Sequence, residues 1–318
     1  MIKPFVKTIL KYLLVCLSLL LVISCNKTSA PVINAQTSTL GSLLATGANT
    51  TIFNSAVVKA GLDSVFSSPA IFTLMVPNDM TCIQSGFSQT VINGFTSDEA
   101  RNWVLYQTYA GTALNFESFI GKTEVKLIMA NGDSTFVSGD SNRTYVNGYQ
   151  FLNSEATCTN GVMLSLQNVL LPPTQNLSQM VNSDTSLTFF NQAIQLSTPF
   201  PDTLSVLLTS GGPFTVIAPN NDAFRNVGYN TPSDLNAVSP DSLRTLVLLS
   251  LIPQRLFGYD VGDSSVFQTL ADSTLIFYIT GIQTTVQVVG SDTTANVLSV
   301  SPMARNGVLF KIDGLLER

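Results

Sequence analysis

Few residues in this sequence could carry out catalysis or bind a metal ion. Histidine is absent, which removes Ser-His-Asp and Cys-His catalysis and every His-ligated zinc or haem site. Paired carboxylates are the remaining route to acid–base chemistry, and the pairs are Asp98 with Glu99, Asp133 with Asp140, and Asp260 with Asp263. The first pair complements a helix N-terminus and the others flank turns, so we expect structural roles. We therefore predict no catalytic, cofactor-binding or metal-binding residue.

Aromatic side chains that could stack on sugar rings occur in two places. Trp103, Tyr106 and Tyr109 lie on one predicted helix, where the three-residue spacing of the first two is typical of a side that faces the core. Tyr145 and Tyr149 are expected to be exposed on one face of a strand. That strand face is the better platform for a carbohydrate.

Charge is sparse along the whole chain. The 318 residues are 45% hydrophobic and only 11% charged, with a formal net charge of −5. Polar surface is supplied instead by Ser, Thr and Asn, a balance typical of secreted or cell-surface proteins rich in β-structure. No basic patch is present, so we expect no nucleic-acid partner. The length and apolar content allow one large core or two ordinary ones.

The first 25 residues resemble a bacterial lipoprotein signal. Lys3, Lys7 and Lys11 form a basic region, and the apolar residues 12–23 that follow are too few to span a bilayer comfortably. The sequence Val-Ile-Ser-Cys that ends at Cys25 resembles a lipobox, in which the cysteine is lipidated and becomes the new N-terminus. The alternative is an uncleaved anchor with an incidental cysteine. We predict a signal peptide over 1–24, lipidation at Cys25, a polar tether over 25–36, and attachment to the membrane, with the outer membrane favoured and its face undecided.

Periodic patterns predict the same order of elements in both halves of the chain. Helical spacing opens each half, and Thr96 to Glu99 form a capping box that starts a helix near Ser97. Strands are expected at 125–129 and 135–137, joined by Asn131-Gly132 as a type I′ turn. In the second half Ser239 and a following proline cap a helix, and strands are expected at 274–280, 285–289 and 296–300.

Two sequence signatures repeat at a similar long separation. Phe72-Thr73-Leu74-Met75-Val76-Pro77-Asn78 returns as Phe214-Thr215-Val216-Ile217-Ala218-Pro219-Asn220. An Asn-Gly turn that leads into an apolar strand also occurs twice, at Asn160-Gly161 and Asn306-Gly307. One long separation between copies indicates two similar domains and not a solenoid of short repeats.

These signatures resemble those of the fasciclin domain, a cell-surface adhesion module. The resemblance implies an α+β fold of two tandem domains, over 37–173 and 175–318, each a twisted and mainly antiparallel sheet packed with helices. We interpret the signature residues as architectural; they are Pro77, Asn78, Asn160, Gly161, Pro219, Asn220, Ala223, Phe224, Asn306 and Gly307.

A disulfide between Cys82 and Cys158 also follows from the resemblance. Both cysteines lie beside a signature in the first repeat, and the two signature strands run close together in fasciclin domains. An extracytoplasmic address and an even cysteine count favour the bridge over two free buried thiols.

The resemblance implies a function in adhesion without catalysis. We expect a lipid-anchored envelope protein that mediates cell adhesion or binds an extracellular polymer, with a protein or polysaccharide ligand that the sequence does not identify. The alternative is a carbohydrate-binding accessory or enzyme of a polysaccharide-utilisation system. Animal members have been associated with integrin binding through Tyr-His and Asp-Ile elements, which are replaced in the second copy by Leu249-Ser250 and Ser301-Pro302. We therefore do not predict integrin recognition.

Overall fold

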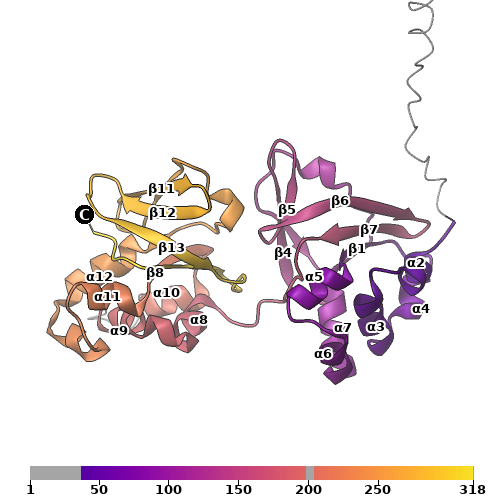
Figure 1. Ribbon diagram of the computed structural model, residues 1–318, viewed down its shortest axis with the longest axis horizontal. Coiled ribbons are helices and arrows are strands. Elements are labelled where there is room, and N and C mark those ends of the chain that lie inside the picture. Colours follow the sequence, from indigo (N-terminus) through magenta and orange to yellow (C-terminus); the bar gives the residue numbers. More distant parts are fainter. Residues whose placement is uncertain (1–36, 198–203, 318) are drawn as a thin grey trace, which may run out of the picture. The chain divides into compact units, whose positions relative to one another are not determined.

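Two α+β domains follow one another along the chain. The computed structural model describes residues 37–197 and 204–317. Each domain contains a seven-stranded sheet, with most helices gathered on one side of it (Figure 1). The predicted signal peptide, Cys25 and the whole of the predicted tether lie outside the described residues.

The first domain has the strand order β2-β1-β7-β6-β5-β4-β3. Strands β1 and β7 are parallel and the other neighbours are antiparallel. The strands are β1 (Phe72–Pro77), β2 (Thr108–Ala110), β3 (Val125–Ile128), β4 (Ser134–Gly139), β5 (Thr144–Val146), β6 (Tyr149–Cys158) and β7 (Gly161–Leu166). The helices are α2 (Leu40–Thr46), α3 (Thr51–Lys59), α4 (Asp63–Phe66), α5 (Asp79–Gln84), α6 (Gln89–Gly94), α7 (Ser97–Tyr106) and the 3-10 helix η2 (Phe116–Phe119).

The second domain repeats this topology with the order β10-β11-β12-β13-β14-β8-β9, and its parallel pair is β8 with β14. The strands are β8 (Phe214–Pro219), β9 (Leu251–Ile252), β10 (Val266–Gln268), β11 (Thr274–Thr280), β12 (Gln283–Val288), β13 (Thr294–Val300) and β14 (Gly307–Ile312). The helices are α8 (Leu177–Ser183), η3 (Thr185–Leu187), α9 (Thr188–Leu196), α10 (Leu204–Ser210), α11 (Asn221–Asn226), η4 (Pro232–Ala237), α12 (Pro240–Leu249) and η5 (Gly258–Asp260).

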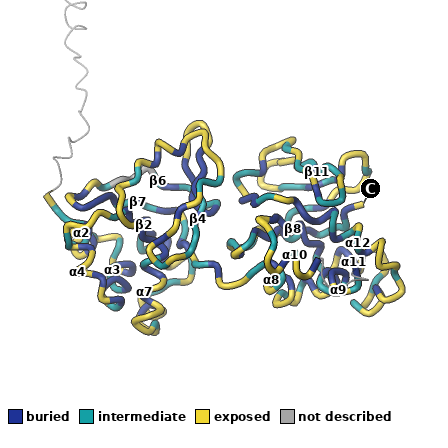
Figure 2. Tube along the Cα trace, turned by 180° about the vertical axis from the view of Figure 1, so that it is seen from behind, coloured by how far each residue is buried: buried dark blue, intermediate teal, exposed yellow. Residues whose placement is uncertain are grey.

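The first-signature strand of each repeat lies inside a core on both faces. In β8, Val216 and Ala218 face the helices, while Ile217 packs into a second cluster on the opposite side of the sheet. In β1, Leu74 faces the helices and Met75 the opposite cluster. A strand buried on both faces has no solvated side, and this explains its continuous apolar run. The buried segments accordingly pass through the centre of each sheet and along the inward sides of the helices (Figure 2).

Local sequence signals account for several helix starts. The capping box predicted at Thr96 is confirmed: its hydroxyl accepts from the Glu99 amide, and the Glu99 carboxylate accepts from the Thr96 amide. Ser239 caps α12 as predicted. Among the described residues, none of the helices combines the length and apolarity needed to cross a bilayer.

The predicted hairpin at 125–137 forms, but its turn type differs from the prediction. A type I′ turn needs positive φ at both central residues, whereas in this turn Gly132 has a φ of 92° and Asn131 is not among the positive-φ residues. The Gly132 amide donates to the Met129 carbonyl. This bond closes a turn whose central residues, Ala130 and Asn131, are not among the positive-φ residues, and Gly132 follows in the left-handed region. A two-residue turn with positive φ at both positions occurs instead at Asn147-Gly148, between β5 and β6.

Candidate functional site

The asparagine of the first signature caps a short helix in each repeat. Asn78 Oδ1 accepts from the Thr81 amide at 2.8 Å, and Asn220 Oδ1 accepts from the Ala223 amide at 2.9 Å. Pro77 and Pro219 are the last residues of β1 and β8, immediately before these caps. Since Ala223 and Phe224 are fully buried beneath the cap, these signature residues are occupied with holding the strand-to-helix turn.

The residue after this asparagine binds the start of helix α3 in the first repeat and of α9 in the second, a role that was not predicted from the sequence. Asp79 accepts from the Ile52 amide at 2.9 Å and from the Thr51 hydroxyl at 2.7 Å. Asn221 makes the corresponding pair of contacts to the first residues of α9. The signal was present in the sequence, since an Asp or Asn follows Pro-Asn in both copies and a Thr opens both helices.

The asparagine of the second signature ties three segments together. Asn160 Oδ1 accepts from the Leu40 amide, and its Nδ2 donates to the Phe66 and Ser68 carbonyls, all at 2.8 Å. In the second repeat Asn306 makes the same three contacts, which join the start of α8 to the end of α10 and the residue just beyond it. One side chain therefore closes the opening helices onto the sheet.

The glycine beside it is required by close backbone packing. A Cβ at Gly307 would lie 2.0 Å from the Phe214 carbonyl oxygen, and one at Gly161 would lie 1.8 Å from that of Phe72. Each glycine starts a strand that pairs in parallel with the first-signature strand. The two signatures are therefore adjacent in space, and their residues form the framework of the fold.

Cys82 and Cys158 are free, buried thiols, so the predicted disulfide is wrong in this structure. Cys158 pairs with Gly161, beside the Phe72 end of β1, whereas Cys82 follows the opposite end at Pro77. The length of β1 between these ends is about 17 Å, and a disulfide needs Cα atoms within about 7 Å. The signature strands do run together, but the cysteines lie toward opposite ends of them.

The carboxylate pairs have the structural partners expected of turns and caps. Asp140 accepts from the Asn142 and Arg143 amides, which lower its pKa. Asp260 accepts from the Phe257 amide, and Asp263 from the Ile279 amide. Within the part of the chain that the structure describes, no group of three or more His, Cys, Asp or Glu side chains could hold a metal ion.

The predicted aromatic platform is not exposed. Trp103 and Tyr106 are buried, as their spacing indicated, and the Trp103 ring stacks on Phe87 at a centroid distance of 5.3 Å. Tyr145 is only 8% exposed, because its ring stacks on that of Tyr259 with centroids 4.2 Å apart. Tyr149 packs partly buried against the core. The interpretation of Tyr145 and Tyr149 as a sugar-stacking surface is therefore wrong.

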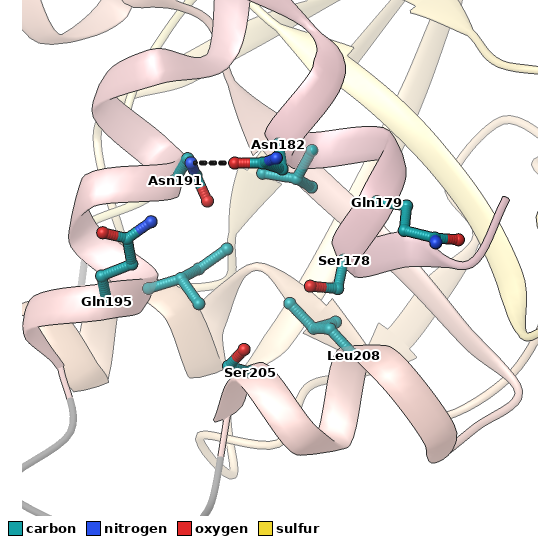
Figure 3. A pocket seen from close by; sticks show the side chains of 9 residues that line it. Ser178, Gln179, Asn182, Asn191, Gln195, Ser205 and Leu208 are labelled. Carbon is teal, nitrogen blue, oxygen red and sulfur yellow. Dashed lines mark hydrogen bonds between the residues drawn. The ribbon is translucent and has the colours of Figure 1, made fainter. Parts of the chain in front are cut away.

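A pocket among α8, α9 and α10 of the second repeat is the best candidate for a ligand site (Figure 3). Its cavity volume is about 230 Å³. The polar lining consists of hydroxyl and amide side chains: Ser178, Gln179, Asn182, Asn191, Gln195 and Ser205. The apolar lining is Val181, Ile194 and Leu208, each of them buried.

The polar groups of this pocket are positioned by the helices that carry them. Asn191 on α9 donates from Nδ2 to Asn182 Oδ1 on α8 at 3.1 Å, a contact that spans the pocket wall (Figure 3). Gln179 lies at the rim, where its Oε1 accepts from the Asn176 amide in a capping box. Ser178 and Ser205 face one another from α8 and α10. Among the residues that the structure describes, no charged side chain lines the pocket, so these residues offer neutral donors and acceptors over an apolar floor.

This pocket was not predicted from the sequence. Its amide residues lie on exposed or half-exposed helix positions, where polar side chains are ordinary. No local motif marks them. The pocket is recognised only once α10, which the sequence analysis did not predict, is placed beside α8.

Comparisons with known proteins agree with the repeat architecture. The family model "Fasciclin domain" matches residues 48–172 and again 180–318. The curated relatives include transforming growth factor-beta-induced protein ig-h3 from Sus scrofa and from Oryctolagus cuniculus, each 27% identical over 173 residues. These alignments cover 54% of this chain but only 23% of each relative.

A solved structure also resembles the chain. It is described as a novel fold revealed by a FAS1 domain pair from the insect cell adhesion molecule fasciclin I; it is 15% identical, covers 84% of this chain and 96% of that one, and has a TM-score of 0.41. The family match, by contrast, spans most of the sequence in two successive copies and coincides with the two observed domains. The chain therefore belongs to the fasciclin domain family.

Proposed function

We propose that this protein is a lipid-anchored component of the cell envelope that mediates adhesion by binding an extracellular polymer. The observation that carries the proposal is the pair of fasciclin domains, matched at 48–172 and 180–318. This family supports a non-catalytic role of the adhesion type. The absence of histidine from the whole sequence is consistent with that role.

Sequence features near the N-terminus support the anchor. The basic region, the short apolar stretch and the cysteine at position 25 follow the order of a lipoprotein signal. Several acyl chains on one cysteine would hold the protein more firmly than a single chain, whose binding is marginal. We expect Cys25→Ala to abolish incorporation of a labelled fatty acid, and labelling that persists in this variant would contradict the anchor.

Adhesion is tested with the full-length protein. Cells that produce it and cells that lack it are compared for attachment to surfaces coated with polysaccharides or matrix proteins. The purified full chain is then screened against the same polymers for saturable binding and for product release. Saturable binding without turnover supports the proposal, whereas product formation would favour an enzyme of polysaccharide utilisation, and equal attachment by both kinds of cell would contradict adhesion.

A further inference from the structure

The two repeats can be placed in register through their hydrogen bonds. Leu40 and Leu177 both donate to the second-signature asparagine, and Phe66 and Leu208 both accept from it. Ile52 and Phe189 both donate to the residue after the first-signature asparagine. Residues of α2 and α3 therefore correspond one by one to residues of α8 and α9.

This register shows where the pocket residues differ between the two repeats. Ser178, Asn182 and Gln195 of the pocket correspond to Gly41, Ala45 and Val58 in the first repeat. Asn191 corresponds to Asn54 and Gln179 to Ser42, so these two positions are polar in both repeats. At the other three positions, the second repeat has a side chain that can form hydrogen bonds and the first repeat does not.

Helix packing explains why the first repeat is closed at this place. A Cβ added to Gly41 would lie 2.3 Å from Ser67 Oγ and 3.0 Å from the Asp63 carbonyl oxygen, so α2 lies directly against α4 and the residue that ends it. Ser178 occupies the corresponding place in α8, and α10 leaves a cavity of about 230 Å³ beside it. The small residue closes the first copy, and the larger polar ones surround an opening in the second.

We propose that the pocket among α8, α9 and α10 binds a single neutral sugar unit of a polysaccharide. This inference rests on the proposed polymer-binding function and names the class of polymer. Amide and hydroxyl groups both donate and accept hydrogen bonds, which suits ligand hydroxyls, and the apolar floor suits the C–H face of a sugar ring. A cavity of about 230 Å³ is smaller than the roughly 300–1,000 Å³ of pockets for drug-sized ligands, as expected for one unit of a longer chain.

Electrostatics favours a neutral ligand over an acidic one. The described part of the lining contains no Lys or Arg, and the chain has a formal net charge of −5. A uronic acid or sulfated sugar would enter without a compensating cation and would lose its hydration. The ligand is therefore a neutral glycan, and a bound peptide segment is the competing outcome of the test.

The test uses the full-length protein and two variants that copy the first repeat, Asn182→Ala and Gln195→Val. Both positions are exposed, so we expect the fold to be retained, and circular dichroism checks this. The matched control is Asn54→Ala, which changes the residue equivalent to Asn191 in the first repeat. The probes are short oligosaccharides of glucose, mannose, galactose and xylose, oligogalacturonate as the acidic counterpart, and an unstructured peptide pool.

Calorimetric titration of each probe gives the decision. We expect at least one neutral oligosaccharide to bind saturably, Asn182→Ala and Gln195→Val each to weaken that binding about tenfold, as the loss of one hydrogen bond to the ligand would, and Asn54→Ala to leave it unchanged. Binding of oligogalacturonate or of peptide alone would overturn the proposal. If both pocket variants bind polymer as well as the unmodified protein does, the proposed sugar site is wrong but the adhesion role stands. If the unmodified protein binds no polymer, both proposals are contradicted.

Discussion

Removing the Asn160 side chain should unfold the first domain at markedly lower denaturant concentration. The side chain is 1% exposed and makes three hydrogen bonds of 2.8 Å to backbone groups from two other segments. Each bond contributes about 1 kcal/mol net, and its loss leaves buried backbone groups without partners. We expect Asn160→Ala to lower the free energy of unfolding by about 3 kcal/mol.

An aspartate at the same position separates hydrogen bonding from packing. In Asn160→Asp the carboxylate still accepts from the Leu40 amide but faces the two carbonyl oxygens that the amide nitrogen served. Burial and this repulsion raise the pKa of the new carboxyl group in the folded state. The folded protein then binds a proton more tightly than the unfolded chain, so this variant loses stability as the pH rises from about 4 to 7. Asn160→Ala carries no such group and serves as the reference for the pH series.

The single tryptophan makes this measurement specific to one domain. Trp103 is the only tryptophan in the chain, and it is buried in the core of the first repeat beside Phe53 and Phe87. Its fluorescence during chemical unfolding therefore reports the domain that contains Asn160. Asn306→Ala is the matched control, because it removes the same three contacts in the other domain and should act mainly on the remaining circular dichroism signal. A loss below about 0.5 kcal/mol for Asn160→Ala, or equal pH dependence of the alanine and aspartate variants, would refute the role assigned to this side chain.

Three further predictions concern other contacts of the framework. Gly307→Ala should destabilise the second domain by about 3 kcal/mol in chemical unfolding, because the new Cβ would lie 2.0 Å from a carbonyl oxygen of β8; a loss under 1 kcal/mol would contradict the close approach. Cys82, whose pKa is raised to about 12 chiefly by burial and further by a nearby aspartate, and Cys158 should be alkylated only after unfolding; a disulfide-linked peptide in non-reducing mass analysis would contradict this. Burial alone would raise the pKa of Asp184, but its hydrogen bonds and the Lys311 ammonium at 3.0 Å lower it overall. The stability that this contact contributes is therefore present above about pH 4 and lost as the pH falls. We expect Asp184→Asn to lower the free energy of unfolding by about 1 kcal/mol at pH 7 and to make that free energy depend less on pH below about 4.

The elements that local chemistry determines could be predicted from the sequence. A capping box at Thr96 needs only residues within one turn of helix, and the alternation in 274–280 needs only one buried face, which the structure assigns to β11. The repetition of the two signatures supplied the long-range information, because a strand pattern that returns with the same flanking turns indicates the same domain again. Those features depend on neighbours in sequence or on identity between copies.

The disulfide failed for a reason that sequence proximity could not reveal. Signature strands that lie side by side can run parallel or antiparallel, and each choice places their flanking residues differently. Here β1 and β7 are parallel, so a cysteine after β1 and a cysteine before β7 lie toward opposite ends of the pair. Antiparallel strands would have brought those flanks to one end of the sheet. Strand direction, which no residue in either signature encodes locally, decided the outcome.

The pocket could not be predicted from either repeat alone, because its residues stand out only when equivalent positions of the two repeats are compared. Polar residues such as Asn182 and Gln195 are common on an exposed helix face. Gly41 by itself indicates only a position of low helix propensity. The hydrogen bonds of Asn160 and Asn306 set the register between the repeats. In that register, these differing positions all lie around the pocket of the second domain, where the side chains are larger or more polar. The Pro-Asn and Asn-Gly framework residues are the same in both repeats, whereas this one cluster of surface positions differs. Because the signature residues maintain the fold in both repeats, a ligand site is best sought among the positions whose residue types differ between the repeats.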